Sequence, residues 1–263
     1  MLYYYSPATG ETYASPQLLS RFGIDVNTSP VSVINARGFY PVIPNEPDFD
    51  TTLYTATYTW SIVAYGSDLG AEKVYTAVPK TLLQAQTAGS GSVKTHAQNV
   101  INNWSATTGY TIDMLTPVAA QLAVNRPARF AAQLDILQAY SEVLNRQLDY
   151  IDAAATVDEI NDVVNPPAIT GEITINATGN DLDDSFVVSI TGVSADDLSL
   201  YFPSTDTTVA YDSGTSKFPA TVGVFSGGDY TGIVRYLGVY NLAEFDASAP
   251  PVTVTIDWNY DNY

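Results

Sequence analysis

The sequence predicts an α+β, multi-domain protein with a small β-rich N-terminal domain, a central helical region and a C-terminal all-β sandwich. Residues 1–88 are rich in Tyr, Thr, Pro and Val, and turn signals interrupt them often. In residues 89–165 apolar side chains recur at helical spacing, whereas residues 166–263 hold short alternating segments separated by Gly- and Asp-rich turns. A hydrophobic content of 46% with 12% aromatic residues indicates that the chain folds.

Short strands and one short helix are expected in residues 1–88. The segment TLYTATYTWSIVAY, residues 52–65, alternates apolar and polar side chains and predicts the longest strand or a hairpin. SPQLLSRFG predicts a helix with Ser15 as its cap, Pro16 in its first turn and Gly23 near its end.

The helical region is predicted to begin after a hinge. The small residues of TAGSGSVK, residues 87–94, suggest that hinge, and a helix is expected from residue 93 to about residue 106. A second, short helix is expected to open at Thr116, which precedes a proline. Thr156 and Glu159 have the spacing of a capping box and predict a last short helix that ends before Asn-Pro-Pro.

The longest helix is predicted from Pro127 to about Ala154. Its apolar residues recur in alternating steps of four and three, as in helices that pack against another helix. This predicted seam, an oligomer interface, contains Phe130, Leu134, Leu137, Leu144, Leu148 and Ile151. A second apolar stripe beside the seam leaves open that the helix is buried within its own chain. Its members are Ile136, Tyr140, Val143 and Tyr150.

The clearest C-terminal strand is VTVTIDWNY, residues 252–260, in which every second residue is apolar or aromatic. Aromatic faces can stack on sugar rings. Trp258, Tyr260 and Tyr263 are therefore the candidates for glycan stacking, although tyrosine is also common in strands with one wet face.

Residue types restrict the chemistry that the chain could perform. It has no cysteine, and a catalytic triad or a nitrogen-ligated metal site would depend on its single histidine, His96. We therefore expect no catalytic residue, no metal site and no cofactor. Carboxylates are abundant, so a glycosidase-like acid pair stays open. Clusters such as Asp181, Asp183 and Asp184 could bind calcium but lack EF-hand spacing, which favours solvated turns.

Charge and hydropathy exclude further classes. The 28 acidic and 10 basic residues give a formal charge of −18, which disfavours binding of nucleic acid. No apolar run approaches the roughly 18 to 20 residues of a membrane span. The opening MLYYYSPATG lacks the features of a signal peptide, so synthesis in a cytoplasm is expected.

Two motifs carry a resemblance to a known family. The segment GFYPVIPNEPDFD, residues 38–50, is followed by helices and by IDAAATVDEI, residues 151–160. This order resembles tail-fibre and tail-fibre-associated proteins of tailed bacteriophages over residues 38–164. The resemblance implies a virion protein of the tail, made in the host cytoplasm and usually trimeric, whose N-terminal part docks on the baseplate or tail. We therefore expect a homotrimer and contacts with other tail or baseplate proteins.

The expected function is that of a non-enzymatic structural protein of the tail fibre or baseplate periphery, which links the tail to the distal fibre or the host surface. The alternative is a receptor-binding, lectin-like tail tip that recognises a host surface glycan. A third possibility, from another class, is a carbohydrate-active enzyme that uses carboxylates of the C-terminal region.

Overall fold

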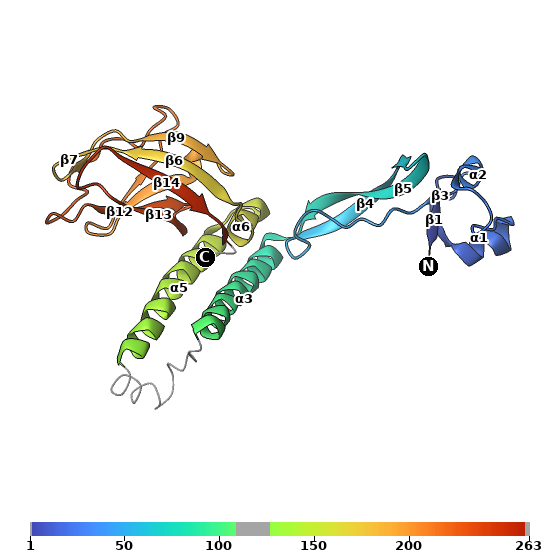
Figure 1. Ribbon diagram of the computed structural model, residues 1–263, viewed down its shortest axis with the longest axis horizontal. Helices are drawn as coiled ribbons and strands as arrows, with labels where there is room; N and C mark the ends of the chain where they lie inside the picture. Colours follow the sequence, from blue (N-terminus) through green and yellow to red (C-terminus); the bar gives the residue numbers. More distant parts are fainter. Residues whose placement is uncertain (1, 109–126, 261–263) are drawn as a thin grey trace. The chain divides into compact units, whose positions relative to one another are not determined.

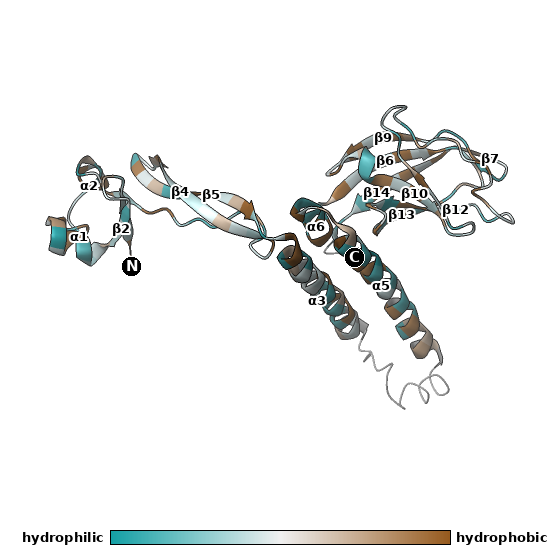
Figure 2. Ribbon diagram, turned by 180° about the vertical axis from the view of Figure 1, so that it is seen from behind, coloured by the Kyte–Doolittle hydropathy of each residue, from teal (hydrophilic) through white to brown (hydrophobic). Residues whose placement is uncertain are grey.

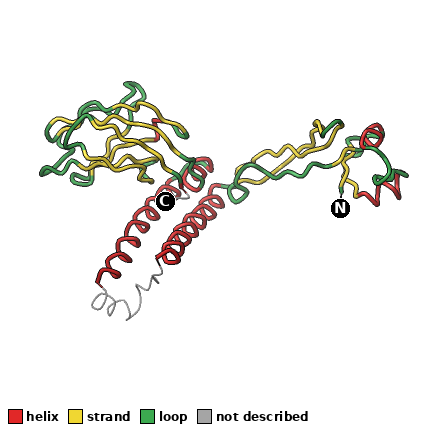
Figure 3. The backbone as a smooth tube through the Cα atoms, viewed as in Figure 1, coloured by secondary structure: helices red, strands yellow, loops and turns green. Residues whose placement is uncertain are grey.

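A computed structural model describes residues 2–108 and 127–260 (Figure 1). The chain divides into two compact units, Met1–Lys80 and Thr81–Tyr263, called the N-terminal and C-terminal units below. Five α-helices and several antiparallel sheets occur among the described residues (Figure 3), so the prediction of a mixed α and β protein is confirmed. The division lies before the predicted boundary at residue 88, and the helices share one unit with the C-terminal strands.

The N-terminal unit begins with a small antiparallel sheet of strands β1 (Tyr3–Ser6), β2 (Glu11–Ala14) and β3 (Tyr40–Pro41), in the order β2-β1-β3. Helices α1 (Ser15–Phe22) and α2 (Val31–Ala36) connect β2 to β3. One cluster of buried side chains holds these elements together. It consists of Tyr4, Tyr13, Leu18, Ile24, Ile34 and Phe39.

Helix α1 follows its sequence signals closely. Its N-cap is Ala14, one residue before the predicted cap, and the Gln17 side chain accepts a hydrogen bond from the Ala14 N–H at 2.8 Å. The helix ends at Gly23, whose φ of 67° suits a residue without a side chain. Helix α2 was not predicted, because the Thr-Ser-Pro before it suggested only a turn.

A long two-stranded hairpin completes this unit. β4 (Tyr54–Tyr65) and β5 (Asp68–Pro79) are 12 residues each and pair along their whole length. Gly66, at φ 64°, begins the turn between them. The alternation in residues 52–65 therefore predicted β4 correctly.

The C-terminal unit contains helices α3 (Leu82–Thr108), α5 (Pro127–Ala153) and α6 (Val157–Val164). Helices α3 and α5 lie side by side (Figure 1). The long helix predicted from Pro127 is thus confirmed. So is the capping box of α6, in which the Thr156 hydroxyl accepts from the Glu159 N–H at 3.2 Å.

The predicted hinge at residues 87–94 is wrong, since α3 runs through it. Thr81 and Gln84 exchange hydrogen bonds at the start of α3 and satisfy its first N–H groups. A Cβ atom at Gly89 would lie 2.8 Å from the Ile160 side chain, so this glycine permits close packing of α3 on α6. The short helix predicted to open at Thr116 lies outside the described residues.

The strands of the C-terminal unit form two main antiparallel sheets. The three-stranded sheet consists, in spatial order, of β14 (Val252–Trp258), β6 (Ile169–Ile175) and β9 (Phe186–Thr191). The four-stranded sheet consists of β11 (Thr207–Ala210), β10 (Leu198–Phe202), β12 (Thr231–Tyr236) and β13 (Tyr240–Asp246). A short pair, β7 (Ala177–Thr178) and β8 (Asp181–Leu182), and the 3₁₀ turn Ala195–Asp197 lie in the connections.

Large apolar side chains from both sheets are fully buried. Among them are Phe202 on β10, Tyr240 on β13 and Ile173 on β6. Aromatic rings meet at right angles within this core: the Phe202 ring lies 5.1 Å from the Phe225 ring. The C-terminal unit therefore has a core of its own.

Candidate functional site

The predicted seam on α5 is only partly exposed. Ile151 is fully buried, and its Cδ1 lies 3.6 Å from the Cβ position of Gly89 on α3. It belongs to the core of its own chain and cannot form an oligomer interface, which corrects the prediction for this residue. Leu134 is 37% exposed. The other members are half-buried: Phe130, Leu137, Leu144 and Leu148.

The side of α5 that is buried within the chain is displaced from the seam by about one residue. Gln133, Val143 and Gln147 are buried on it, together with Ile151. Val143 belongs to the second apolar stripe, and it is buried within its own chain, as the alternative interpretation of this helix expected. Two glutamines also occupy inward positions, which an apolar periodicity cannot reveal.

Gln147 is part of a polar joint between α5 and the four-stranded sheet. Its Nε2 donates to the Tyr240 hydroxyl at 2.9 Å, and that hydroxyl donates to the Val163 carbonyl of α6. Next to Gln147, Arg146 Nε donates to the Val239 carbonyl at 2.9 Å. Burial raises the pKa of Tyr240, so its hydroxyl stays protonated and can donate to the Val163 carbonyl. We call these three contacts the polar joint.

Trp258 is not presented for sugar stacking, which corrects that prediction. It is 6% exposed, and its ring lies 5.2 Å from the Tyr240 ring in the core. The reason is that the aromatic face of β14 is the face that packs inward. Tyr260 is half-buried, and its ring stacks on that of His96 at 3.9 Å and 14°. Tyr263 lies outside the described residues.

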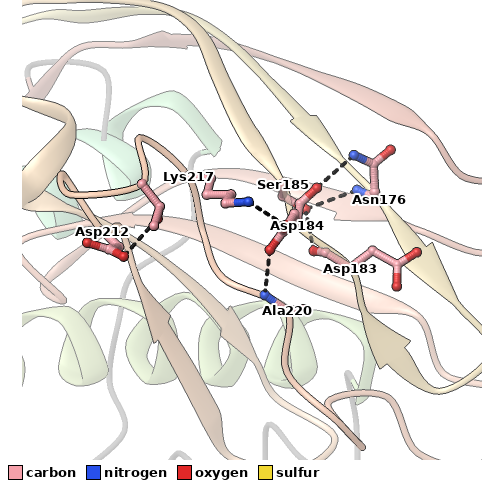
Figure 4. Close-up of polar contacts among 8 residues, drawn as sticks. Asn176, Asp183, Asp184, Ser185, Asp212, Lys217 and Ala220 are labelled. Atoms are coloured by element: carbon pink, nitrogen blue, oxygen red, sulfur yellow. Dashed lines mark hydrogen bonds and ion pairs between the residues drawn. The ribbon is translucent and has the colours of Figure 1, made fainter.

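The acidic residues near β8 organise loops, as Figure 4 shows. The Asp184 carboxylate accepts from Lys217 Nζ at 2.5 Å and from the Ala220 N–H at 3.1 Å. These bonds, with Lys217 first, lower the pKa of Asp184. Asp183 accepts instead from the Thr178 hydroxyl at 2.6 Å, and Asp181 from a backbone N–H.

These three carboxylates thus bind separate partners. Across residues 2–108 and 127–260, no three or more His, Cys, Asp or Glu side chains are grouped as metal ligands would be. The arrangement agrees with the interpretation of this stretch as solvated turns.

Sequence reasoning missed a pocket in the N-terminal unit. Its volume is about 690 Å³, and β1, β2, α1, β4 and β5 all contribute to it. The lining residues are Tyr3, Gly10, Glu11, Thr12, Tyr13, Gln17, Arg21, Val42, Tyr58, Trp60 and Lys73. Four of them are aromatic and two are cationic, a combination that occurs in binding sites rather than in cores.

Aromatic rings form one wall of this pocket. Tyr58 and Trp60 lie two residues apart on β4, so both project from the same face of the hairpin, and their rings meet edge to face at 5.9 Å. Tyr5 stacks on Trp60 at 4.5 Å and 19°, which holds the indole in place. Lys73, opposite Trp60 on β5, places its ammonium 4.2 Å from the Tyr58 ring centroid.

Polar groups line the rest of the pocket. Tyr13 donates its hydroxyl to Glu11 Oε2 at 2.8 Å, and the Gln17 Oε1 is already bonded to the Ala14 N–H. Among the described residues, Arg21 forms no hydrogen bond and no ion pair. The signal that could have found this site is the run Tyr58-Thr-Trp60 on one strand with Lys73 on the next.

The outer edge of β4 is a second open surface of the N-terminal unit. The Ala71 carbonyl of β5 bonds the Ile43 N–H at 2.8 Å, so it points away from β4. Because Ala71 is paired with Ile62, the alternation of an antiparallel ladder turns the backbone groups of Ile62 outward too. The same holds at every second residue from Ala56 to Ala64. In the described chain, this edge bonds no further strand.

No helix in the part of the chain that the structure describes is long and apolar enough to span a bilayer. Compared with known proteins, the chain matches no family model, no curated protein and no solved structure.

Proposed function

We propose that this chain is a non-enzymatic structural protein of a tailed-bacteriophage virion, at the tail fibre or baseplate periphery. Its N-terminal unit attaches it to a protein partner, and its C-terminal unit extends toward the distal fibre or the host surface. The observation that carries the proposal is the β4–β5 hairpin, which leaves apolar side chains and one backbone edge uncovered.

A two-stranded hairpin in water is marginally stable unless it packs on something. This one keeps large apolar side chains exposed on both faces, with bands of hydrophobic residues along β4 and β5 (Figure 2). These residues are Ile62, Tyr65, Leu69, Val74 and Val78, each between 37% and 49% exposed. Covering such a ribbon with a partner would remove that apolar surface from water, which favours attachment through it.

The open edge of β4 supports the same role. Exposed strand edges invite pairing with another chain, and proteins usually blunt them with charges, proline or a bulge. From Tyr54 to Tyr65, β4 contains no charged residue and no proline, and its pairing with β5 shows no register shift. It is therefore suited to accept an added strand from a partner.

The oligomeric part of the proposal is a homotrimer. Phe130, Leu134, Leu137, Leu144 and Leu148 are the seam residues that keep some exposure, so a threefold contact would use them. We also propose that the two C-terminal sheets form a β-sandwich. The alternative function, a lectin-like receptor-binding tip, would need a site other than the buried Trp258.

Two matched proline variants of the full chain test the attachment. Ala56→Pro removes an outward N–H from the β4 edge without removing a bond to β5. Ala77→Pro is the control, because Ala77 faces Ala56 in the register and its N–H points outward from β5 instead. We expect virions assembled with the Ala56 variant to lose the protein and those with the Ala77 variant to keep it.

Normal copy number of the Ala56 variant in purified particles would refute attachment through β4. Native mass spectrometry of the unmodified chain tests the trimer separately. A trimer that dissociates on Leu137→Asp is expected, because a carboxylate in an apolar contact is costly to desolvate. A monomer at all concentrations would refute the trimer and leave the edge experiment meaningful.

A further inference from the structure

We propose that the pocket of the N-terminal unit is a binding site for a carboxylated carbohydrate, such as a hexuronic or a sialic acid residue. This inference goes beyond the assembly role and does not depend on it. It stands on three features of the lining: exposed aromatic faces, two cations that pair with no carboxylate among the described residues, and fixed hydrogen-bond donors and acceptors.

The aromatic side chains of the pocket expose ring surface to solvent. Tyr3 and Tyr58 are each 50% exposed, and the Trp60 ring beside Tyr58 is braced from behind by Tyr5. The C–H face of a pyranose ring is apolar and packs on such rings, while its hydroxyls point sideways to polar groups. In contrast to Trp258, these aromatic side chains line a cavity.

The cations determine the charge of the ligand. Arg21 and Lys73 both line the pocket, which contains one acidic residue, Glu11, so its lining carries a net charge of +1. The whole chain carries −18, so a locally positive pocket is unusual in it. A guanidinium that has no ion pair in the described structure is suited to bind a carboxylate with two parallel hydrogen bonds.

The remaining polar groups fit hydroxyls better than a polyanion. Gln17 has its oxygen engaged by the Ala14 N–H, which leaves the amide nitrogen as a donor. Glu11 has one oxygen engaged by Tyr13, and its second oxygen is an acceptor that would repel phosphates but bind sugar hydroxyls. Donors, an acceptor and an aromatic face together favour an acidic sugar over a nucleotide.

The test is isothermal titration of the full chain with two probes, short oligomers of galacturonic acid and of sialic acid. The matched ligand control is the carboxyl-reduced form of each oligomer, which has the same rings without the charge. We expect at least one acidic oligomer to bind, and its reduced form to bind at least tenfold more weakly. Failure of both oligomers to bind, or equal binding of the reduced forms, would overturn the proposal.

Variants connect the binding to the pocket. Arg21→Gln should weaken it at least tenfold, whereas Arg37→Gln, the same charge change on an exposed residue outside the pocket, should leave it unchanged. Tyr58→Ala should weaken binding of the sugar because it removes a stacking ring, whereas Tyr58→Phe should keep the binding. Equal losses for Arg21→Gln and Arg37→Gln would contradict the site, as would tighter binding of a polyglutamate peptide than of either sugar. Unchanged thermal unfolding of each variant confirms that the fold is retained.

Discussion

The two units handle apolar surface in opposite ways. The C-terminal unit buries its largest side chains in two sheets and three helices, and Trp258 is buried even at the end of the last strand. Among the described residues of the N-terminal unit, a cluster of six buried residues joins the small sheet to α1 and α2, and the hairpin keeps large apolar side chains exposed. Charge differs as well: residues 1–80 contain seven acidic and four basic residues, and residues 81–263 contain 21 and six.

Under the proposed function, the N-terminal unit is the one that depends on contacts with a partner. A unit with its own core is stable alone, and a strong negative charge keeps its surface from associating with anionic surfaces. A unit that exposes a ribbon of aromatic and β-branched residues would gain stability if a partner covered that ribbon, as we propose. The four predictions that follow test this contrast, beginning with the largest effect.

The first prediction removes a ring from the C-terminal core. Phe202→Ala should lower the free energy of unfolding by about 3–5 kcal/mol, because Phe202 is fully buried against Phe225 and Phe245. Denaturant unfolding followed by fluorescence measures it. Val222→Ala is the control: Val222 is 86% exposed, and its truncation should change stability by less than about 0.5 kcal/mol. A loss below 1 kcal/mol for Phe202→Ala would mean that this core is not what stabilises the unit.

The second prediction concerns the small N-terminal core. Leu18 is fully buried and belongs to the cluster of six buried residues. Leu18→Ala should therefore lower the free energy of unfolding by about 2–5 kcal/mol. With so few buried partners, that loss should open the N-terminal unit while the other stays folded. Hydrogen exchange should rise in peptides from residues 2–80 and stay unchanged in 169–258. Equal increases in both ranges would show that the two units unfold together.

The third prediction uses two glycines of the same helix. Gly89→Ala should destabilise the C-terminal unit by about 1–3 kcal/mol, because the new methyl would lie 2.8 Å from Ile160 and 3.3 Å from Val164. Gly91→Ala meets nothing within 4 Å and should stabilise the helix by about 0.5–1 kcal/mol. Opposite shifts in melting temperature are expected. Shifts of the same sign would mean that α3 and α6 are not packed as closely as described.

The smallest expected effect tests the acidity of the C-terminal unit. Burial, followed by the charge of Asp197, raises the pKa of Asp162. A raised folded-state pKa means that the ionised group destabilises at neutral pH, and that this penalty disappears as the pH falls through that pKa. Asp162→Asn should therefore stabilise by about 0.3 kcal/mol at pH 7, a small effect because the side chain is only partly buried and solvent screens its charge.

Below the unfolded-state pKa of about 4, the Asp162→Asn advantage should vanish. Unfolding curves of the variant and of the unmodified chain between pH 3 and pH 7 measure this difference in stability. The control is Asp257→Asn, which changes an exposed residue of β14. A benefit that grows on acidification would contradict the sign of the shift.

Sequence patterns predicted the elements whose causes are local. Strand β4 follows from alternation, α6 from the capping box of Thr156 and Glu159, and α5 from its periodicity. The first turns of α3 had a local signal as well, in Thr81 and Gln84, but the glycines at 89 and 91 suggested a hinge instead. The close approach of Ile160 and Val164 on α6 explains why glycine stands at residue 89 inside a helix.

The surfaces could not be predicted in the same way, because their causes lie far apart in the chain. Gln147 faces inward since its hydrogen-bond partner is Tyr240, 93 residues later, so a seam drawn from apolar spacing missed the buried side of α5. Trp258 looked like an exposed aromatic because its strand also carries polar residues. The pocket could not be predicted from local patterns because its lining residues come from five different elements.

The polar joint also has a mechanical consequence. Arg146 and Gln147 are adjacent on α5, and both bond groups at the start of β13. Sliding α5 by one turn, about 5.4 Å, would break both contacts at once and leave their buried partners unsatisfied. A load applied along α5 is therefore carried by bonds that act in parallel, and it passes to the sheet before the helix can slip.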